Sequence, residues 1–253
     1  MPFKQILGAI RKADLDYGLI HEGDRICVGV SGGKDSLLLL HALSVYRNLK
    51  MRYDHKSFEV VGIHLNMGFP GGNFQPIRDF EESHHVEYHD VDTRIYDILR
   101  LYPDTDGKIQ CSRCSTLKKG AIVKSAREFG CNKTAFAHHA DDAVETLFLN
   151  MIYGGRIAVF EPGMHLERAN MDFIRPFVYA REEDIRHTAL NELHLPVVKS
   201  GCPNDGFTKR QDIKELLASV YEKYPEAKHN FLTAISNREQ LKLWVKGADW
   251  QEN

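Results

Sequence analysis

A short polar loop with adjacent glycines is the first place where the chain could do chemistry, and it comprises Ser31, Gly32, Gly33, Lys34, Asp35 and Ser36. The loop follows an apolar run of strand length and opens a segment of helical pattern. Such a turn leaves backbone N–H groups free and directs the positive end of a helix dipole at a phosphate. It is not a Walker A loop, because Val28 replaces that motif's first glycine and Asp35 its Ser or Thr. The loop therefore predicts a nucleotide phosphate site, although glycines also occur in strand-to-helix turns that bind nothing.

Cysteines form the second candidate site. Cys111 and Cys114 are spaced C-x-x-C at the start of an expected helix. The helix dipole and the neighbouring Arg113, Lys118 and Lys119 are expected to favour the thiolate forms, which bind metals or sulfur. The chain has 5 cysteines, and this odd number favours metal or redox chemistry over disulfides in a reducing compartment.

Cys202 is the expected third thiol of this site. A structural zinc ion needs four ligands, whereas three thiolates hold an iron–sulfur cubane and leave one iron open to an exogenous ligand. The remaining cysteines, Cys27 in an apolar run and Cys131 after a helix-ending glycine, are expected to be buried or incidental thiols. The thiols therefore predict a metal centre that takes part in chemistry.

A third polar group follows a later strand, where His138 and His139 precede Asp141 and Asp142. Carboxylates in the first turn of a helix are stabilised by its dipole and can serve as caps without any further function. The carboxyl ends of parallel strands meet at one edge of a sheet, however. We therefore expect these side chains to face the same crevice as the phosphate loop.

The elements that must position these groups alternate between strand and helix patterns. Strands are expected at 25–30, 58–65, 86–91, 133–137 and 173–177. Helices are expected at 2–20, 36–49, 75–84, 93–101, 115–129, 141–153 and 181–193. The near-continuous apolar strands predict an α/β fold with a Rossmann-like, doubly wound, mainly parallel sheet. Helical patterns at 209–224 and 227–244 predict a C-terminal cap over 208–253, packed on a domain that spans 1–207.

Composition excludes several classes of protein. The 253 residues are 43% hydrophobic and 27% charged, which is typical of a folded globular chain and not of a disordered one. The net charge of -2 gives no overall attraction to nucleic acid or membranes. Charges are nevertheless segregated, since 76–106 is acidic and 108–133 is basic, and taken alone the basic block is best explained as a solvated helix face. No export signal or membrane-spanning stretch is evident, so we expect a cytoplasmic protein.

The motifs taken in order resemble a known family. The string Ser-Gly-Gly-Lys-Asp-Ser at 31–36 is similar to the signature of the PP-loop ATP pyrophosphatases, a resemblance that implies cleavage of ATP to AMP and pyrophosphate through an adenylated intermediate. Further motifs are Cys-Ser-Arg-Cys at 111–114, His-His-Ala-Asp-Asp at 138–142, Thr-Leu-Phe-Leu-Asn-Met-Ile-Tyr-Gly-Gly at 146–155 and Ile-Arg-Pro-Phe at 174–177. Together they resemble the tRNA 2-thiocytidine synthetase family over 3–244, nearly the whole chain.

This resemblance implies a PP-loop fold with a [4Fe-4S] cluster held by Cys111, Cys114 and Cys202. A related thiouridine-forming branch uses a lysine one helical turn after the second cysteine and the aspartate of a His-x-x-Asp element. These positions correspond to Lys118 and Asp142, and thiocytidine enzymes also carry arginine at the first of them. Cys202 has no second neighbouring cysteine and the chain has no zinc ribbons, so the identity of the modified base stays open.

The implied reaction is ATP-dependent tRNA thiolation. ATP with Mg²⁺ would lie across the loop 31–36, with adenine near His64, Leu65 and Ala137. A base carbonyl oxygen, expected in a cytidine of the anticodon loop, would attack the α-phosphate and release pyrophosphate, and sulfide held on the cluster would then displace AMP. Lys118 would stabilise the developing phosphate charge, and Asp142 would orient the metal or a proton transfer.

Two other functions stay open on the sequence. A PP-loop ligase would pass adenylated RNA or an adenylated carboxylate to an amine, with zinc on the cysteines. A nucleotide or redox sensor would bind ATP without turnover. The expected partners are tRNA and a sulfur donor, either a cysteine desulfurase or free sulfide, with no membrane, and a homodimer is compatible with the sequence.

Overall fold

The computed structural model describes residues 2–69, 73–103, 109–198, 201–202, 209–240 and 242–243. Within these ranges one 6-stranded sheet has the order β3-β2-β1-β4-β6-β5. The parallel strands are β1 (Arg25–Val30), β2 (Glu59–Asn66), β3 (Glu87–Asp92), β4 (Lys133–Ala135) and β6 (Met171–Ile174). The expected Rossmann-like, mainly parallel sheet is therefore confirmed. The edge strand β5 (Gly163–Leu166), which runs antiparallel to β6, was not predicted.

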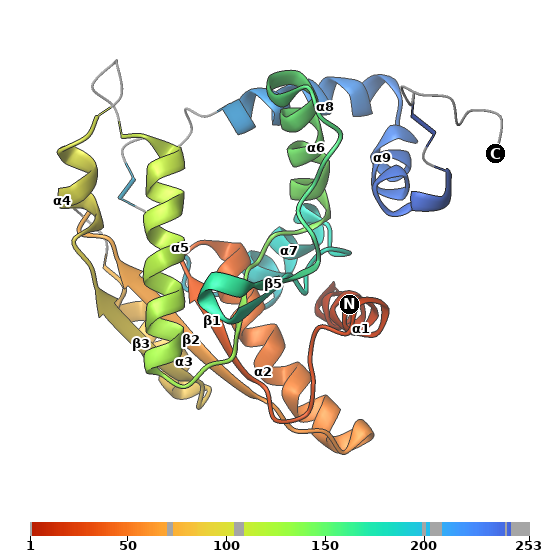
Figure 1. Cartoon of the computed structure of the whole chain (residues 1–253). Coiled ribbons are helices and arrows are strands. Elements are labelled where there is room, and N and C mark those ends of the chain that lie inside the picture. The colour runs from red at the N-terminus through yellow and green to blue at the C-terminus, as the bar shows by residue number, and fades with distance from the viewer. Residues whose placement is uncertain are drawn as a thin grey trace.

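Helices cover both faces of the sheet (Figure 1). One face packs against α1 (Pro2–Tyr17), α2 (Lys34–Asp54), α3 (Gln75–Ser83) and α7 (Glu182–His187). The opposite face packs against α5 (Cys111–Glu128). The remaining helices are α4 (Ile95–Arg100), α6 (Ala140–Gly154), α8 (Lys209–Lys223) and α9 (Ala227–Ser236), with short turns at Glu167–Ala169, Thr188–Glu192 and Arg238–Gln240.

The two-sided cover explains why the central strands are almost continuously apolar. In β1, Ile26, Cys27 and Val28 are fully buried, because helices lie on both sides of this strand. Cys131 is also buried, so the prediction that Cys27 and Cys131 are core thiols is confirmed. Gly62 in β2 allows a close approach, since a Cβ there would lie 2.7 Å from Leu40 on α2.

The C-terminal helices pack on α6 and not on the sheet, as the top of Figure 1 shows. Their contact is a small apolar cluster of Val144 on α6 with Ile213 and Leu217 on α8. The expected boundary between 207 and 208 lies outside the described residues. The expected helix at 181–193 is instead α7 followed by a π turn, and the expected helix at 227–244 ends at Ser236.

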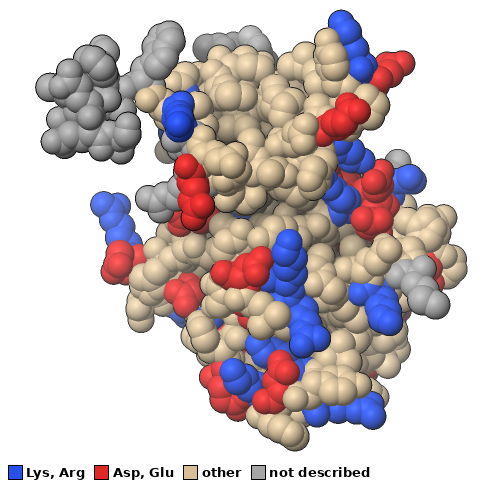
Figure 2. Space-filling model, turned by 90° about the vertical axis from the view of Figure 1, so that its right-hand side faces the viewer, with Lys and Arg blue, Asp and Glu red and all other residues tan. Residues whose placement is uncertain are grey.

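Charged side chains of both signs are mixed on the surface, in keeping with the small net charge of -2. Figure 2 shows lysines and arginines interspersed with acidic side chains over the face that it draws. Among the helices that the structure describes, none has the length and apolar character needed to cross a bilayer.

Glu81 on α3 gives a prediction about stability. The residue is 0% exposed, neither carboxylate oxygen has a hydrogen-bond partner, and burial raises the pKa of Glu81 to about 7. Because the ordinary pKa is 4.5, the stabilising contribution of the neutral acid is complete below pH 4.5 and is lost as the pH rises through 7. We expect Glu81→Gln to reduce the loss of unfolding free energy between pH 5 and pH 8 by about 1–3 kcal/mol.

Urea denaturation at both pH values measures this difference. The exposed neighbour Glu82 provides the matched control, because Glu82→Gln should leave the pH dependence unchanged. A Glu81→Gln profile parallel to that of the native protein would show that Glu81 is ionised in the core at neutral pH.

Candidate active site

A cavity of about 740 Å³ lies at the carboxyl ends of β1, β2, β4 and β6. Its size is within the range of small-molecule and cofactor sites. It brings together the phosphate loop after β1, the end of β2, the segment after β4 and the start of α5. The expected crevice is therefore present, at the edge of the sheet where parallel α/β folds bind ligands.

The phosphate loop has the local geometry that an anion needs. Gly32 has φ +88°, and a Cβ there would lie 2.9 Å from the ring of Phe74, so only glycine fits without strain. The N-cap residue of α2, Gly33, makes no side-chain cap, which leaves N–H groups of the first helical turn available. Ser36 Oγ accepts a hydrogen bond from the N–H of Ser31 at 3.1 Å and thereby closes the loop.

Gly32→Ala is expected to strain this loop. The left-handed conformation alone costs about 1–2 kcal/mol for an L-residue, and the new methyl group would also push Phe74 aside. We expect a correspondingly lower unfolding free energy and weaker binding of ATP. Calorimetric titration with ATP, together with urea denaturation, measures both. The control is Gly8→Ala on α1, where nothing lies within 4 Å of the new Cβ. A native ATP affinity in Gly32→Ala would contradict the role of the loop.

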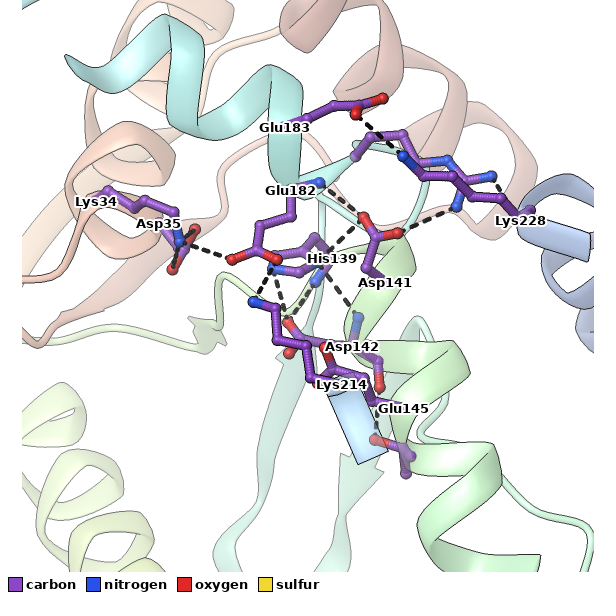
Figure 3. A network of polar contacts seen from close by, with 12 residues as sticks. Lys34, Asp35, His139, Asp141, Asp142, Glu145, Glu182, Glu183, Lys214 and Lys228 are labelled. Carbon is purple, nitrogen blue, oxygen red and sulfur yellow. Dashed lines mark hydrogen bonds and ion pairs between the residues drawn. The ribbon is translucent and has the colours of Figure 1, made fainter. Parts of the chain in front are cut away.

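The side chain of Lys34 does not line the cavity. Ser31, Asp35 and Ser36 line the cavity, whereas the ammonium of Lys34 contacts Asp35 at 3.0 Å and Glu182 at 3.3 Å (Figure 3). Burial opposes the charge of Lys34, but the Asp35 and Glu182 carboxylates outweigh it and raise its pKa. Lys34 therefore remains a cation beside the loop.

Carboxylates on α6 and α7 form a network of ion pairs and hydrogen bonds next to Lys34 (Figure 3). Glu182 also pairs with Lys214 on α8 at 2.6 Å, and its N–H donates to Asp141 at 2.7 Å. Lys228 pairs with Glu183 at 3.0 Å. These contacts connect the phosphate loop to α7 and to the C-terminal helices.

His64, Leu65 and Ala137, the residues predicted to surround adenine, all line the cavity. His64 Nδ1 lies 2.9 Å from the carbonyl oxygen of Val30, and the His64 ring stacks on Phe74 with centroids 3.8 Å apart. Burial lowers the pKa of His64, so the imidazole is neutral with its proton on Nδ1. The structure thus holds a rigid aromatic wall beside the loop.

The three predicted cluster ligands, Cys111, Cys114 and Cys202, line the same cavity. Cys111 and Cys114 lie in the first turn of α5, which begins four residues earlier than expected from the sequence at 115. The prediction that the helix start favours the thiolate is wrong for Cys114. Burial raises the pKa of this thiol, the charge of Lys118 opposes it only in part, and Cys202 and Cys111 raise the pKa further.

The donor set fits a cluster better than a single ion. Within the ranges that the structure describes, no group of three or more His, Cys, Asp or Glu residues converges on one metal position. In a cubane cluster each thiolate binds a different iron, so the sulfur atoms need not converge. Cys111, Cys114 and Cys202 all line the cavity, and Cys111 and Cys202 contribute to the raised pKa of Cys114.

Lys118 and Asp142 both line the cavity, as predicted. Asp142 also caps α6, since its carboxylate accepts the N–H of His139 at 3.0 Å. Its other oxygen lies 3.3 Å from Arg210. Asp142 therefore both caps α6 and faces the cavity. Asp141, in contrast, does not line the cavity and pairs with Arg181 at 3.4 Å.

Lys119 and His138 line the cavity as the sequence suggested, whereas four further wall residues received no role from the sequence, and they are Thr146, Phe160, Arg175 and Arg210. Burial lowers the pKa of His138 to about 4, so this imidazole is neutral at physiological pH. His138 Nδ1, His64 Nε2 and Arg175 Nε are buried without a hydrogen-bond partner. Buried polar groups in native proteins are nearly always satisfied, so these atoms would be satisfied by an ordered water or by a polar ligand in the cavity.

The fold and this cavity define the class of the protein: an α/β nucleotide-binding protein of the PP-loop type. No protein-family model matches the chain. It is 38% identical over 93% of its length to the tRNA-cytidine(32) 2-sulfurtransferase of Pelobacter propionicus, covering 86% of that protein. It is also 38% identical to the enzyme of the same name from Geobacter sulfurreducens, over 93% of this chain and 90% of that one. The chain belongs to the tRNA-cytidine(32) 2-sulfurtransferase family, which confirms the resemblance found in the sequence.

A solved structure supports the fold. The U34-tRNA thiolase NcsA from Methanococcus maripaludis, determined with its [4Fe-4S] cluster, superposes with a TM-score of 0.72 at 20% identity. The alignment covers 97% of this chain and 81% of that one. The likeness therefore extends to the C-terminal helices as well as the sheet.

Proposed function

We propose that this protein is an ATP-dependent tRNA sulfurtransferase that adenylates the 2-carbonyl of a cytidine in the anticodon loop and replaces the oxygen with sulfur. One observation carries the proposal: a single cavity is lined by Ser31, Asp35 and Ser36 of the phosphate loop, by three thiols, and by Lys118 and Asp142. Relatives at 36–38% identity, of which most of the length is matched, bear the name of this activity.

ATP would bind through the loop 31–36, where free N–H groups and the dipole of α2 favour phosphate. Its adenine would lie against His64, Leu65 and Ala137, which line the cavity next to the loop. Asp35 and Asp142 supply carboxylates on the cavity wall that suit Mg²⁺, a cation that prefers oxygen ligands.

Cys111, Cys114 and Cys202 would hold a [4Fe-4S] cluster, which supplies an iron atom that can carry the sulfur. Burial raises the pKa of Cys114, and iron binding would favour its thiolate. Lys118, one helical turn after Cys114, would stabilise negative charge on the phosphate as pyrophosphate or AMP leaves. Asp142 would hold a proton or the metal at the reacting centre.

The substrate RNA would approach along α5. Lys118, Lys119 and Lys124 on this helix are exposed, and exposed lysines can neutralise backbone phosphates and release their counterions. A base splayed from a loop could then enter the cavity, as single-stranded recognition requires. Three further points stay predictions, and they are a cysteine desulfurase or free sulfide as the sulfur donor, a homodimeric assembly and a cytoplasmic location.

The ligase and sensor alternatives receive less support. The three thiols that line the cavity are one short of the four ligands that a structural zinc ion takes. A sensor has no need of a cavity that combines a phosphate loop with thiols and an acid.

The decisive experiment combines metal analysis with a thiolation assay. Protein prepared without oxygen should contain about four iron and four sulfide per chain. With ATP, Mg²⁺, sulfide and unmodified tRNA it should form 2-thiocytidine, detected by mass spectrometry of the digested RNA, and release pyrophosphate. Zinc in place of iron, or pyrophosphate release without thiolation, would favour the ligase.

A further inference from the structure

Arg175 is a buried cation in the wall of the cavity. It directly follows β6, is only 7% exposed and lines the cavity near His138 and Phe160. Its guanidinium carbon lies 5.0 Å from the centroid of the Phe160 ring. One Nη donates to the carbonyl oxygen of Glu161, while Nε is buried without an acceptor.

Arg175 differs from the other cations around the cavity. Lys34 pairs with Asp35 and Glu182 (Figure 3), and Arg210 pairs with Glu145 at 2.9 Å. Lys118 and Lys119 are exposed and remain solvated. Among the residues that the structure describes, no carboxylate lies within ion-pair distance of Arg175.

The charge of Arg175 needs an anion. A guanidinium stays protonated in proteins, so it cannot escape burial by losing its proton as a lysine can. Burial lowers the pKa of Arg175, and the nearby Glu161 opposes this shift without forming an ion pair. An unpaired buried charge is among the most unfavourable features of a core, and an anionic ligand would relieve it.

A purely structural role explains only part of the geometry. The N–H of Arg175 donates to the carbonyl oxygen of Pro162 at 2.8 Å, and its Nη to that of Glu161, so the residue fastens the segment before β5. The backbone bond needs no side chain, and any neutral donor could make the second one. Neither bond accounts for the positive charge or for the free Nε.

We propose that Arg175 binds a phosphate group of the substrates in this cavity, with its guanidinium donating to a phosphate oxygen. This inference rests on the proposed function and deepens it. The phosphate belongs either to ATP, most simply its α-phosphate next to the reacting base, or to the RNA backbone beside the target nucleotide. Guanidinium groups suit both, because their planar N–H groups match phosphate oxygens.

The test compares Arg175→Met, Arg175→Lys and a control, Arg168→Met, in which an exposed arginine outside the cavity wall is changed. Thermal unfolding is measured with no ligand, with ATP and Mg²⁺, and with an anticodon stem-loop RNA, and dissociation constants are determined for both ligands. In ligand-free protein, Arg175→Met should unfold at the native temperature or above it, because an unpaired buried charge is removed. A ligand raises the unfolding temperature only to the extent that it binds. In Arg175→Met, the rise caused by the ligand whose phosphate Arg175 contacts should therefore be lost.

The affected dissociation constant should rise about 10- to 100-fold in Arg175→Met, as expected for a lost charged hydrogen bond, and Arg175→Lys should recover part of it. A change for ATP alone identifies the nucleotide phosphate. A change for RNA alone, with a salt dependence reduced by about one phosphate contact, identifies the RNA backbone.

Two results would overturn the proposal: unchanged affinity for both ligands, or a ligand-free Arg175→Met protein that is unfolded or much less stable than Arg168→Met. The second result would show that the role of Arg175 is to hold the 160–162 segment in place through its hydrogen bonds. These measurements need no thiolation, so failure of the proposed reaction would be seen separately in the tRNA assay.

Discussion

Cys202→Ser is expected to abolish tRNA thiolation. Of the three thiols that line the cavity, Cys202 comes from outside α5, whereas Cys111 and Cys114 lie in the first turn of that helix. Serine is nearly isosteric but a poor ligand for iron, so the cluster should be lost or degraded. Loss of residues that merely support metal ligands costs 10–100-fold, so loss of a ligand should cost more than about 100-fold in rate. Iron and sulfide content and the rate of 2-thiocytidine formation measure the effect.

Cys131→Ser is the matched control, because Cys131 is a buried thiol that does not line the cavity. This variant should keep its iron and its activity, with at most a modest loss of stability. ATP binding should survive in both variants, since the phosphate loop contains no cysteine. A native iron content in Cys202→Ser would exclude Cys202 as a ligand and leave the cluster with the two thiols of α5.

The central sheet was predictable because its strands are buried on both sides. Apolar runs such as that of β1 have no alternation, and their lengths and flanking glycines separate them from helices. β5 was missed for the opposite reason. It has four residues, pairs on one side only, and buries none of them fully, so it has no strand signal of its own.

The site was predictable where several residues form one contiguous motif, and less so elsewhere. The loop 31–36 and the sequence around Asp142 follow strands, and parallel topology brings strand ends together. Arg210 is a single arginine, and nothing in its neighbours tells a cavity residue from a solvated one. Arg175 directly follows a strand in the Ile-Arg-Pro-Phe motif, which was the available signal.

The sign of the Cys114 shift shows why electrostatics is hard to predict from sequence. The dipole of α5 and the nearby Lys118 were visible in the sequence, and both favour a thiolate. Burial opposes them and is larger, and its size depends on how the chain folds over the thiol. The pKa of the Cys114 thiol is therefore raised, even though two features visible in the sequence favour its thiolate.

Asp142→Asn is expected to separate chemistry from binding. An asparagine oxygen can still accept the N–H of His139, so the cap of α6 and the fold should persist. The variant loses the carboxylate that faces the cavity and pairs with Arg210, so it can neither hold a proton nor bind Mg²⁺ as well. Loss of a positioned acid–base group costs about 10²–10⁴-fold, and we expect thiolation to slow by that factor while ATP affinity changes much less. Single-turnover thiolation and ATP titration measure the two quantities.

Asp141→Asn is the control for this experiment, because Asp141 lies in the same helical turn but does not line the cavity. It accepts the N–H of Glu182 at 2.7 Å, which an asparagine oxygen can also do, so its rate should stay close to native. Equal losses in both variants would assign the effect to the start of α6 as a structural unit. A loss of rate confined to Asp142→Asn would instead place the Asp142 carboxylate at the reacting centre. The two residues share one helical turn, and only Asp142 faces the cavity.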